Sequence, residues 1–157
     1  MKTINIESKE ELESIINECD ICHIGMVAED GSPYVIPMNF AFTGTEIILH
    51  SAPFGSHLNC LNHDNRLCIT FTTPGLLVYQ HEKVACSYRM DSKSVVCKGT
   101  VDFVENLEEK ELLLNVFMKK YSEKSFKYSQ PALKNIKVWL FKIDQISGKA
   151  FGQPHKK

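Results

Sequence analysis

Two β-rich apolar runs on either side of an Asp-Gly pair constrain the fold more than any other feature of the sequence. Residues 21–28 read ICHIGMVA and residues 33–42 read PYVIPMNFAF, with Glu29-Asp30-Gly31-Ser32 between them. Asp-Gly between such runs is typical of a tight β-hairpin. A second turn signal at 42–45 leads into the run EIILHS. The sequence therefore predicts three successive antiparallel strands in a meander.

Three later runs add strands, and few helices accompany them. They are RLCITFTT at 66–73, SVVCKGTVDFVE at 94–105 and KVWLFKIDQISG at 137–148, and a short polar tail follows. Six or seven strands with hairpin connections predict a mainly β fold, a small antiparallel barrel. The sequence contains neither a Rossmann glycine fingerprint nor a P-loop. We expect one domain over residues 1–157.

Local signals predict the helices. Ser8, followed three residues later by Glu11, forms a capping box, and apolar residues recur at helical spacing up to Cys19. Asn106 precedes a second helical run with glutamates at its start and lysines at its end, which complements the helix dipole. A short helix is expected after residue 56. Segment 74–91 gives no readable pattern.

The composition excludes several classes of protein. With 43% hydrophobic and 24% charged residues, the chain is globular rather than disordered. A formal net charge of −1, with no basic run before the last two residues, argues against nucleic-acid binding. No apolar segment approaches the roughly 20 residues of a membrane helix, and no signal peptide is visible. We therefore expect no membrane partner and a cytoplasmic location.

The six cysteines lie mostly in apolar runs, where a thiol behaves as a small hydrophobic side chain. Reduced thiols are the expected state in the cytoplasm. Cys19 and Cys22 form a CxxC pair, but this pair closes a helix and enters a strand. A thioredoxin-type motif opens a helix after a strand. We therefore expect neither a metal site nor a redox role at this pair.

The stretch HSAPFGSHL, residues 50–58, is the strongest candidate for a binding site because it joins a strand to a helix. A helix start presents unpaired N–H groups and the positive end of the helix dipole, so it attracts an anion. Ser51 and Ser56 add hydroxyl groups, and His57 adds a cation when it is protonated. The opposing interpretation is an ordinary turn in which Ser56 caps the helix. These residues alone leave both interpretations open.

Two prolines, Pro33 and Pro37, lie in the predicted strand PYVIPMN. A proline in a strand forgoes a ladder hydrogen bond and is found at sheet edges or bulges. We therefore expect an edge strand. Its free backbone groups either face water or bind the polar rim of a flat ligand.

Taken together, DGSPYVIPMNF, EIILHSAPFGSHL, RLCITF and SVVCKGTVDFVE resemble the pyridoxamine 5′-phosphate oxidase-like flavin-binding split barrels. Within that family the likeness is strongest to nitroimidazole-resistance proteins, and it covers nearly the whole chain. The resemblance implies an antiparallel Greek-key split barrel that forms a homodimer, with FMN in two clefts at the subunit interface. It also implies an FMN-dependent oxidoreductase that acts on a small molecule, with nitroimidazoles as one substrate class.

The resemblance further implies which positions hold the cofactor. The implied contacts are Pro37, Met38 and Asn39 along the flavin ring, His50, Ser51 and Ala52 along the ring and ribityl chain, and Gly55, Ser56, His57 and Ser94 around the phosphate. His50 is also the implied catalytic residue, in contact with the substrate. The alternative is that its ring only bonds its neighbours. Relatives often carry Lys or Arg where this chain has His57, so we expect the affinity for FMN to depend on pH.

Two other functions remain open. The barrel could oxidise or reduce a different small substrate through its flavin, or it could hold flavin or haem without turnover. His50, His57 and His63 keep haem among the alternatives. An absorption spectrum separates flavin from haem, and turnover with a reduced nicotinamide separates an enzyme from a carrier.

The run VWLF, residues 138–141, carries apolar side chains on both faces of the last predicted strand. One face of an antiparallel sheet is normally polar. We therefore expect the outer face of this strand to be covered. A subunit interface, as the resemblance implies, is compatible with such a cover.

Overall fold

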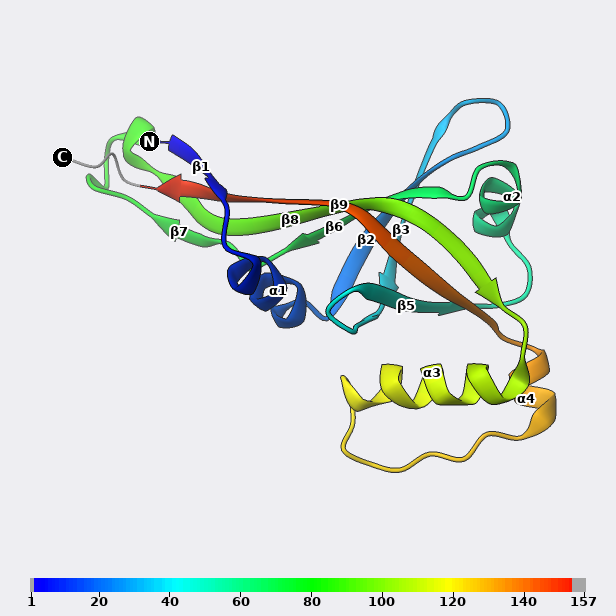
Figure 1. Ribbon diagram of the computed structural model, residues 1–157. Coiled ribbons are helices and arrows are strands. Elements are labelled where there is room, and N and C mark those ends of the chain that lie inside the picture. Colours follow the sequence, from blue (N-terminus) through cyan, green and yellow to red (C-terminus); the bar gives the residue numbers. More distant parts are fainter. Residues whose placement is uncertain (1, 154–157) are drawn as a thin grey trace.

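The computed structural model describes residues 2–153, which form a curled antiparallel sheet with helices packed against it (Figure 1). The strands are β1 (Lys2–Ile6), β2 (Ile21–Val27), β3 (Pro33–Asn39), β4 (Ala41–Phe42), β5 (Glu46–Ser51), β6 (Arg66–Thr72), β7 (Leu76–Val78), β8 (Arg89–Val104) and β9 (Lys137–Gln153). The helices are α1 (Lys9–Glu18), α2 (Ser56–His63), α3 (Leu107–Lys119) and α4 (Gln130–Lys134), with a 3-10 turn at Ala85–Ser87. The predicted mainly β fold is confirmed.

The strands follow the order β3-β2-β6-β8-β9-β5-β4, while β1 adds to β9 and β7 adds to β8. β8 and β9 are sixteen and seventeen residues long, so they extend beyond the barrel. Their outer ends, together with β1 and β7, form a projection that we call the arm (Figure 1). The unreadable segment 74–91 belongs to the arm. No helix within residues 2–153 is long and apolar enough to cross a membrane.

The predicted meander is interrupted: both of its turns form, but its middle strand, 33–42, is divided at Phe40 into β3 and β4. β2 and β3 pair as expected, but β5 pairs with β4 and β9 instead of β3. The chain crosses between the two edges of the sheet at Phe40, which is completely buried. The Tyr121 hydroxyl accepts a hydrogen bond from the Phe40 amide (2.9 Å) and lies 2.8 Å from the Phe40 carbonyl and 2.9 Å from that of Asp20. The Tyr121 hydroxyl thus bonds the backbone groups of Phe40 at the point where the strand ladder is interrupted.

Several local predictions are confirmed. β3, with Pro33 and Pro37, is the edge strand of the sheet order. The Ser8 hydroxyl accepts a hydrogen bond from the Glu11 amide (3.2 Å), and the Asn106 side chain accepts one from the Glu109 amide (2.9 Å), so both predicted helix caps form.

The last strand runs further than the sequence predicts. β9 continues to Gln153 because β1, which the sequence did not reveal, pairs with its end from Gly148 onward. The predicted tail is therefore strand up to residue 153. Its remaining residues, 154–157, and residue 1 lie outside the described part of the chain.

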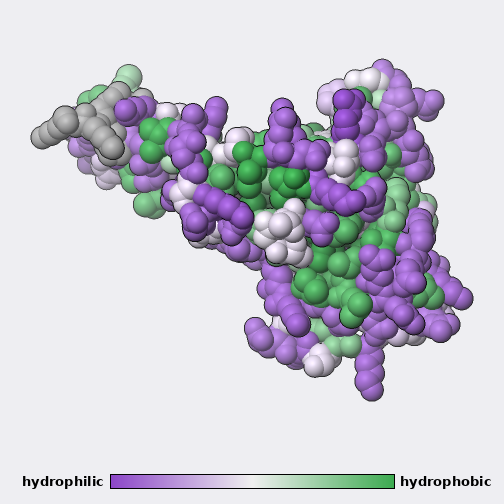
Figure 2. Space-filling model, in the orientation of Figure 1, coloured by the Kyte–Doolittle hydropathy of each residue, from purple (hydrophilic) through white to green (hydrophobic). Residues whose placement is uncertain are grey.

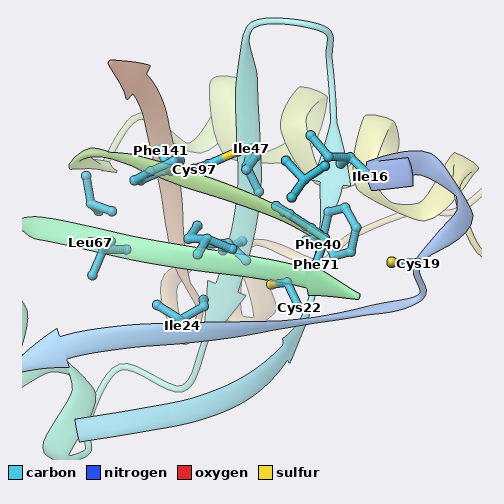
Figure 3. Packing of buried hydrophobic residues seen from close by; sticks show 14 of the residues in the cluster. Ile16, Cys19, Cys22, Ile24, Phe40, Ile47, Leu67, Phe71, Cys97 and Phe141 are labelled. Atoms are coloured by element: carbon cyan, nitrogen blue, oxygen red, sulfur yellow. The ribbon is translucent and has the colours of Figure 1, made fainter. Parts of the chain in front are cut away.

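Two apolar clusters hold the layers together. The larger one fills the barrel and includes Phe40, Phe71 and Phe141 (Figure 3). Trp139 belongs to the same cluster. The smaller one lies between the sheet and the helices α3 and α4. Alternation along β9 sends Trp139 and Phe141 to the barrel and Val138 and Leu140 to the smaller cluster. The outer face of β9 is thus covered as predicted, but by helices of the same chain, so the VWLF pattern is no sign of a subunit interface.

Candidate functional site

The predicted binding stretch connects β5 to α2, and a glycine begins the helix. Gly55 is the N-cap, with φ 136° and ψ 166°, and no side chain caps the helix. This φ lies in the region that favours glycine. The alternative in which Ser56 caps the helix is therefore wrong. The Leu58 amide donates to the Gly55 carbonyl (3.0 Å), whereas the amides of Ser56 and His57 have no backbone acceptor among residues 2–153.

The His57 ring folds over this helix start and stacks on Trp139, with ring centroids 5.5 Å apart and ring planes 30° apart. A Cβ atom on Gly55 would lie 2.6 Å from His57 Cε1, so only glycine leaves room for the ring. His57 Nε2 is buried and has no hydrogen-bond partner among the described residues. A buried, unpaired nitrogen costs free energy. Because Nε2 is closed to solvent, a polar ligand at the helix start would remove that cost only if the ring turned.

Ser51 and Ala52 link the loop to the same tryptophan. The Trp139 indole donates to Ser51 Oγ (3.2 Å), and the Ser51 hydroxyl donates to the Ala52 carbonyl (2.8 Å). Trp139 is completely buried and lies on β9 beside β5. The structure therefore brings Ser51, Ala52, Gly55 and His57 together around one indole. The sequence indicated Trp139 only as an apolar residue of the last strand, and nothing local revealed its place beside the loop.

Acidic residues border the other side of the helix start. Ser56 lines an open cleft of about 520 Å³ against the β2–β3 turn, where Glu29 and Asp30 lie. Hydrogen bonds from Ser32 hold the pKa of the Asp30 carboxyl below its usual range, so it is charged at neutral pH. Negative charge there repels an anion. An anion is therefore favoured on the side of Gly55 and His57.

His50 faces away from this group. Successive side chains of a strand point to opposite faces, and while Ser51 meets Trp139, the His50 ring meets Phe117 of α3 (centroids 4.6 Å apart, planes 72° apart). Burial lowers the pKa of His50, which favours the neutral imidazole. The structure thus places His50 under the helices, on the opposite face of β5 from Ser51.

The three predicted residues of β3 lie at its end, and β3 contacts β5. Met38 packs against the barrel core, and its carbonyl accepts a bond from the Cys22 thiol (3.4 Å). The Asn39 amide donates to the Asp20 carbonyl (3.2 Å), and Pro37 is exposed. The backbone at this exposed end of β3 can approach a ligand that lies beside β5, while the Met38 side chain packs in the core.

Ser94 lies far from the loop within one chain. It pairs with Lys149 of β9, whereas Ser51 pairs with Lys137. These lysines are twelve residues apart, which is about 40 Å of strand. The structure does not bring Ser94 together with the other predicted residues in a single protomer.

The CxxC pair shows no reactive thiol. Burial raises the pKa of Cys22 to about 12, and burial also raises the pKa of Cys19. Thiols with a raised pKa are poor nucleophiles and poor metal ligands. Both side chains belong to the barrel core (Figure 3).

An antiparallel split barrel with a glycine-capped helix start at its rim is the class of protein that this fold and site define. Residues 8–150 match the family described as pyridoxamine 5′-phosphate oxidase, and the chain belongs to that family. The resemblance found in the sequence is confirmed. No curated protein matches the chain significantly.

Solved structures support the same assignment. A candidate 5-nitroimidazole antibiotic resistance protein from Bacteroides thetaiotaomicron VPI-5482 is 45% identical, with a TM-score of 0.88 over 96% of this chain and 88% of that one. The FAD and heme binding protein from Mycobacterium smegmatis (17% identity, TM-score 0.83, 98% and 76% covered) and the flavocytochrome Anf3 from Azotobacter vinelandii (20%, 0.82, 98% and 72%) share the fold. The predicted split barrel is confirmed.

Proposed function

We propose that this protein is an FMN-dependent oxidoreductase that binds the cofactor phosphate at the start of α2. The observation that carries the proposal is the glycine-capped helix start, at which the amides of Ser56 and His57 have no backbone acceptor among residues 2–153. Helix starts of this kind bind phosphate groups. The family assignment supports an oxidoreductase, and the names of two proteins that share the fold, the FAD and heme binding protein and the flavocytochrome, support a flavin.

Each group of site residues contacts a different part of the cofactor. Gly55, Ser56 and His57 hold the phosphate through backbone amides, a hydroxyl and an imidazole, while Ser51 and Ala52 border the ribityl chain. The exposed edge at Pro37 and Asn39, with the backbone of Met38, borders the ring. Bound FMN supplies hydride and electron transfer, and the protein orients it and excludes water.

We propose nitroimidazoles as acceptors and His50 as the side chain in contact with the acceptor, which requires the flavin ring to extend past the edge of β5 to the face that carries His50. The name of the 45% identical Bacteroides protein supports this substrate class. The lowered pKa of His50 keeps its ring neutral, so it can both donate and accept a hydrogen bond.

We also propose that the active form is a homodimer with the cofactor at the subunit interface. Ser94 lies some 40 Å of strand from the loop, so a second copy is needed for both to touch one cofactor. The arm supports this proposal with exposed apolar side chains, which are Leu76, Leu77, Tyr79, Val84 and Met90. Sedimentation that shows only monomer at micromolar concentration would contradict it.

An absorption titration with FMN, and with phosphate-free riboflavin as the control, tests the cofactor assignment. We expect tight FMN binding, weak riboflavin binding and quenching of the single tryptophan, Trp139, because it lies beside the loop. Equal affinity for FMN and riboflavin would contradict the proposed phosphate site. Bleaching of bound FMN by NADH or NADPH, followed by turnover of a nitroimidazole, then tests the reaction.

A carrier of flavin or haem without turnover is the second candidate. The names of the Mycobacterium and Azotobacter proteins, which share the fold, include flavin and haem. A Soret band in the purified protein would favour haem. Bound FMN that reduced nicotinamides never bleach would favour a carrier.

A further inference from the structure

An open cleft of about 520 Å³ lies between the β2–β3 turn and the start of α2. The turn and the helix are neighbours (Figure 1), and Figure 2 shows mainly hydrophilic surface over both. The polar residues that line the cleft are Glu29, Asp30, Tyr34, Ser56 and Asn59. Binding sites of about 300–1,000 Å³ accommodate molecules of drug size, so the cleft is large enough for a nucleoside.

Ser56 connects the cleft to the proposed phosphate site. It lines the cleft, and its backbone amide is one of the two helix-start amides that have no backbone acceptor among residues 2–153. A phosphate bound at that amide therefore lies at the border of the cleft. A group joined to the phosphate can continue from there into the cleft.

Asn59 supplies a donor and an acceptor to the same cleft. It is exposed, and it follows Ser56 by three residues, so the two side chains lie on one face of α2. An asparagine amide forms two hydrogen bonds with the exocyclic amine and the N7 nitrogen of adenine. This position therefore suits an adenine base.

Tyr34 supplies an aromatic side chain on the β3 wall of the cleft. The residue is half-buried and packs against the barrel core, which limits its motion. A nucleobase stacks on an aromatic ring of this kind whatever its sequence of polar groups. Tyr34 and Asn59 thus offer the two kinds of contact, stacking and paired hydrogen bonds, through which proteins bind a base.

The carboxylates of the turn suit the sugar. Asp30 and Glu29 line the cleft, and hydrogen bonds from Ser32 hold the pKa of the Asp30 carboxyl below its usual range. A carboxylate at such a position accepts hydrogen bonds from ribose hydroxyls. The same charge repels a phosphate. The cleft therefore favours an uncharged group with hydroxyls, next to a helix start that favours the anion.

We propose that this cleft binds the adenosine half of FAD, so that the site which holds FMN also accepts FAD. FAD is FMN extended from its phosphate by adenosine monophosphate. Both phosphates stay beside the amides of Ser56 and His57, and only the uncharged adenosine enters the cleft. The inference rests on the proposed function for the place of the phosphate. Binding of adenosine itself requires no flavin.

The first test compares FAD with FMN by absorption and tryptophan quenching. We expect FAD to bind at least five-fold more tightly, the effect of about one additional hydrogen bond. The second test titrates adenosine and inosine, followed by ligand-observed NMR, into the protein with and without saturating FMN. Inosine carries an oxygen in place of the exocyclic amine, so adenosine should bind more tightly than inosine in both states.

Asn59→Ala removes the amide and leaves the proposed FMN contacts in place. We expect it to lower the affinity for FAD about five-fold, to abolish the preference for adenosine over inosine and to leave the affinity for FMN unchanged. Asn62→Ala, at an exposed asparagine of the same helix that does not line the cleft, is the matched control. It should change none of these affinities.

Equal affinity of the natural protein for FAD and FMN would overturn the inference, as would an unchanged affinity for FAD in Asn59→Ala. FMN binding with no binding of adenosine would likewise contradict the cleft and leave the phosphate site standing. Binding of adenosine in preference to inosine, by a protein that does not distinguish FMN from riboflavin, would support the cleft and contradict the phosphate site alone.

Discussion

His57 stacks on Trp139 with ring centroids 5.5 Å apart, although the two residues lie on different elements far apart in the sequence. The stack holds the imidazole over Gly55 and leaves Nε2 buried without a partner. This one contact turns a glycine-capped helix start into a site with a preferred side for an anion.

Gly55→Ala should weaken FMN binding at least ten-fold and lower the stability by about 1–3 kcal/mol. The new Cβ would displace the His57 ring, and the positive φ disfavours any other residue. FMN titration and thermal unfolding measure the two effects. Gly31→Ala is the control, because Gly31 has φ +81° and nothing within 4 Å of an added Cβ. It should cost stability and leave FMN affinity unchanged. Equal FMN affinity in the two variants would contradict the proposal that Gly55 and His57 bind the phosphate.

His57→Lys places an ammonium group at the start of α2, where a cation attracts a phosphate. We expect this variant to bind FMN about two- to five-fold more tightly than the natural protein at neutral pH. Tryptophan quenching provides the measurement, with riboflavin as the control. Equal affinity for FMN in both proteins would rule out His57 as the phosphate partner.

Tyr121→Phe should destabilise the protein by about 2–3 kcal/mol, since it leaves the Phe40 amide and nearby carbonyls without their partner. Urea unfolding measures the change in the free energy of unfolding. Tyr79→Phe, at a residue that is 53% exposed, should change it by less than about 0.5 kcal/mol. A loss no larger than that of the control would show that the chain reversal at Phe40 does not depend on Tyr121.

Burial of His50 should make stability depend on pH in a defined direction. Because burial lowers its pKa in the folded state, the unfolded chain binds a proton more readily. The resulting stability is present above the ordinary histidine pKa of about 6.5 and is lost as the pH falls through the folded-state value. His50→Gln should reduce the slope of unfolding free energy against pH in this window. Urea unfolding at a series of pH values measures both slopes, and identical slopes would contradict the burial effect.

Much of the fold follows from short stretches of sequence. The caps at Ser8 and Asn106, the hairpin at Asp30-Gly31 and the edge position of β3 formed as predicted. Each depends on residues a few positions apart, whose sterics and hydrogen bonds act before any distant contact exists. The loop 50–57 was likewise recognisable, because a strand end and a helix start are local patterns.

The tertiary structure decided which of these pieces meet. The sequence by itself determined most of the strands and helices, the family and the candidate loop, but not β1, β7 or α4. Only the folded chain showed that β5 pairs with β9, that α3 and α4 cover the outer face of β9, and that His50 and Ser51 serve opposite faces. Strand pairing and helix docking join residues dozens of positions apart, so the free energy of burial across the whole chain selects them, and no local pattern records that choice.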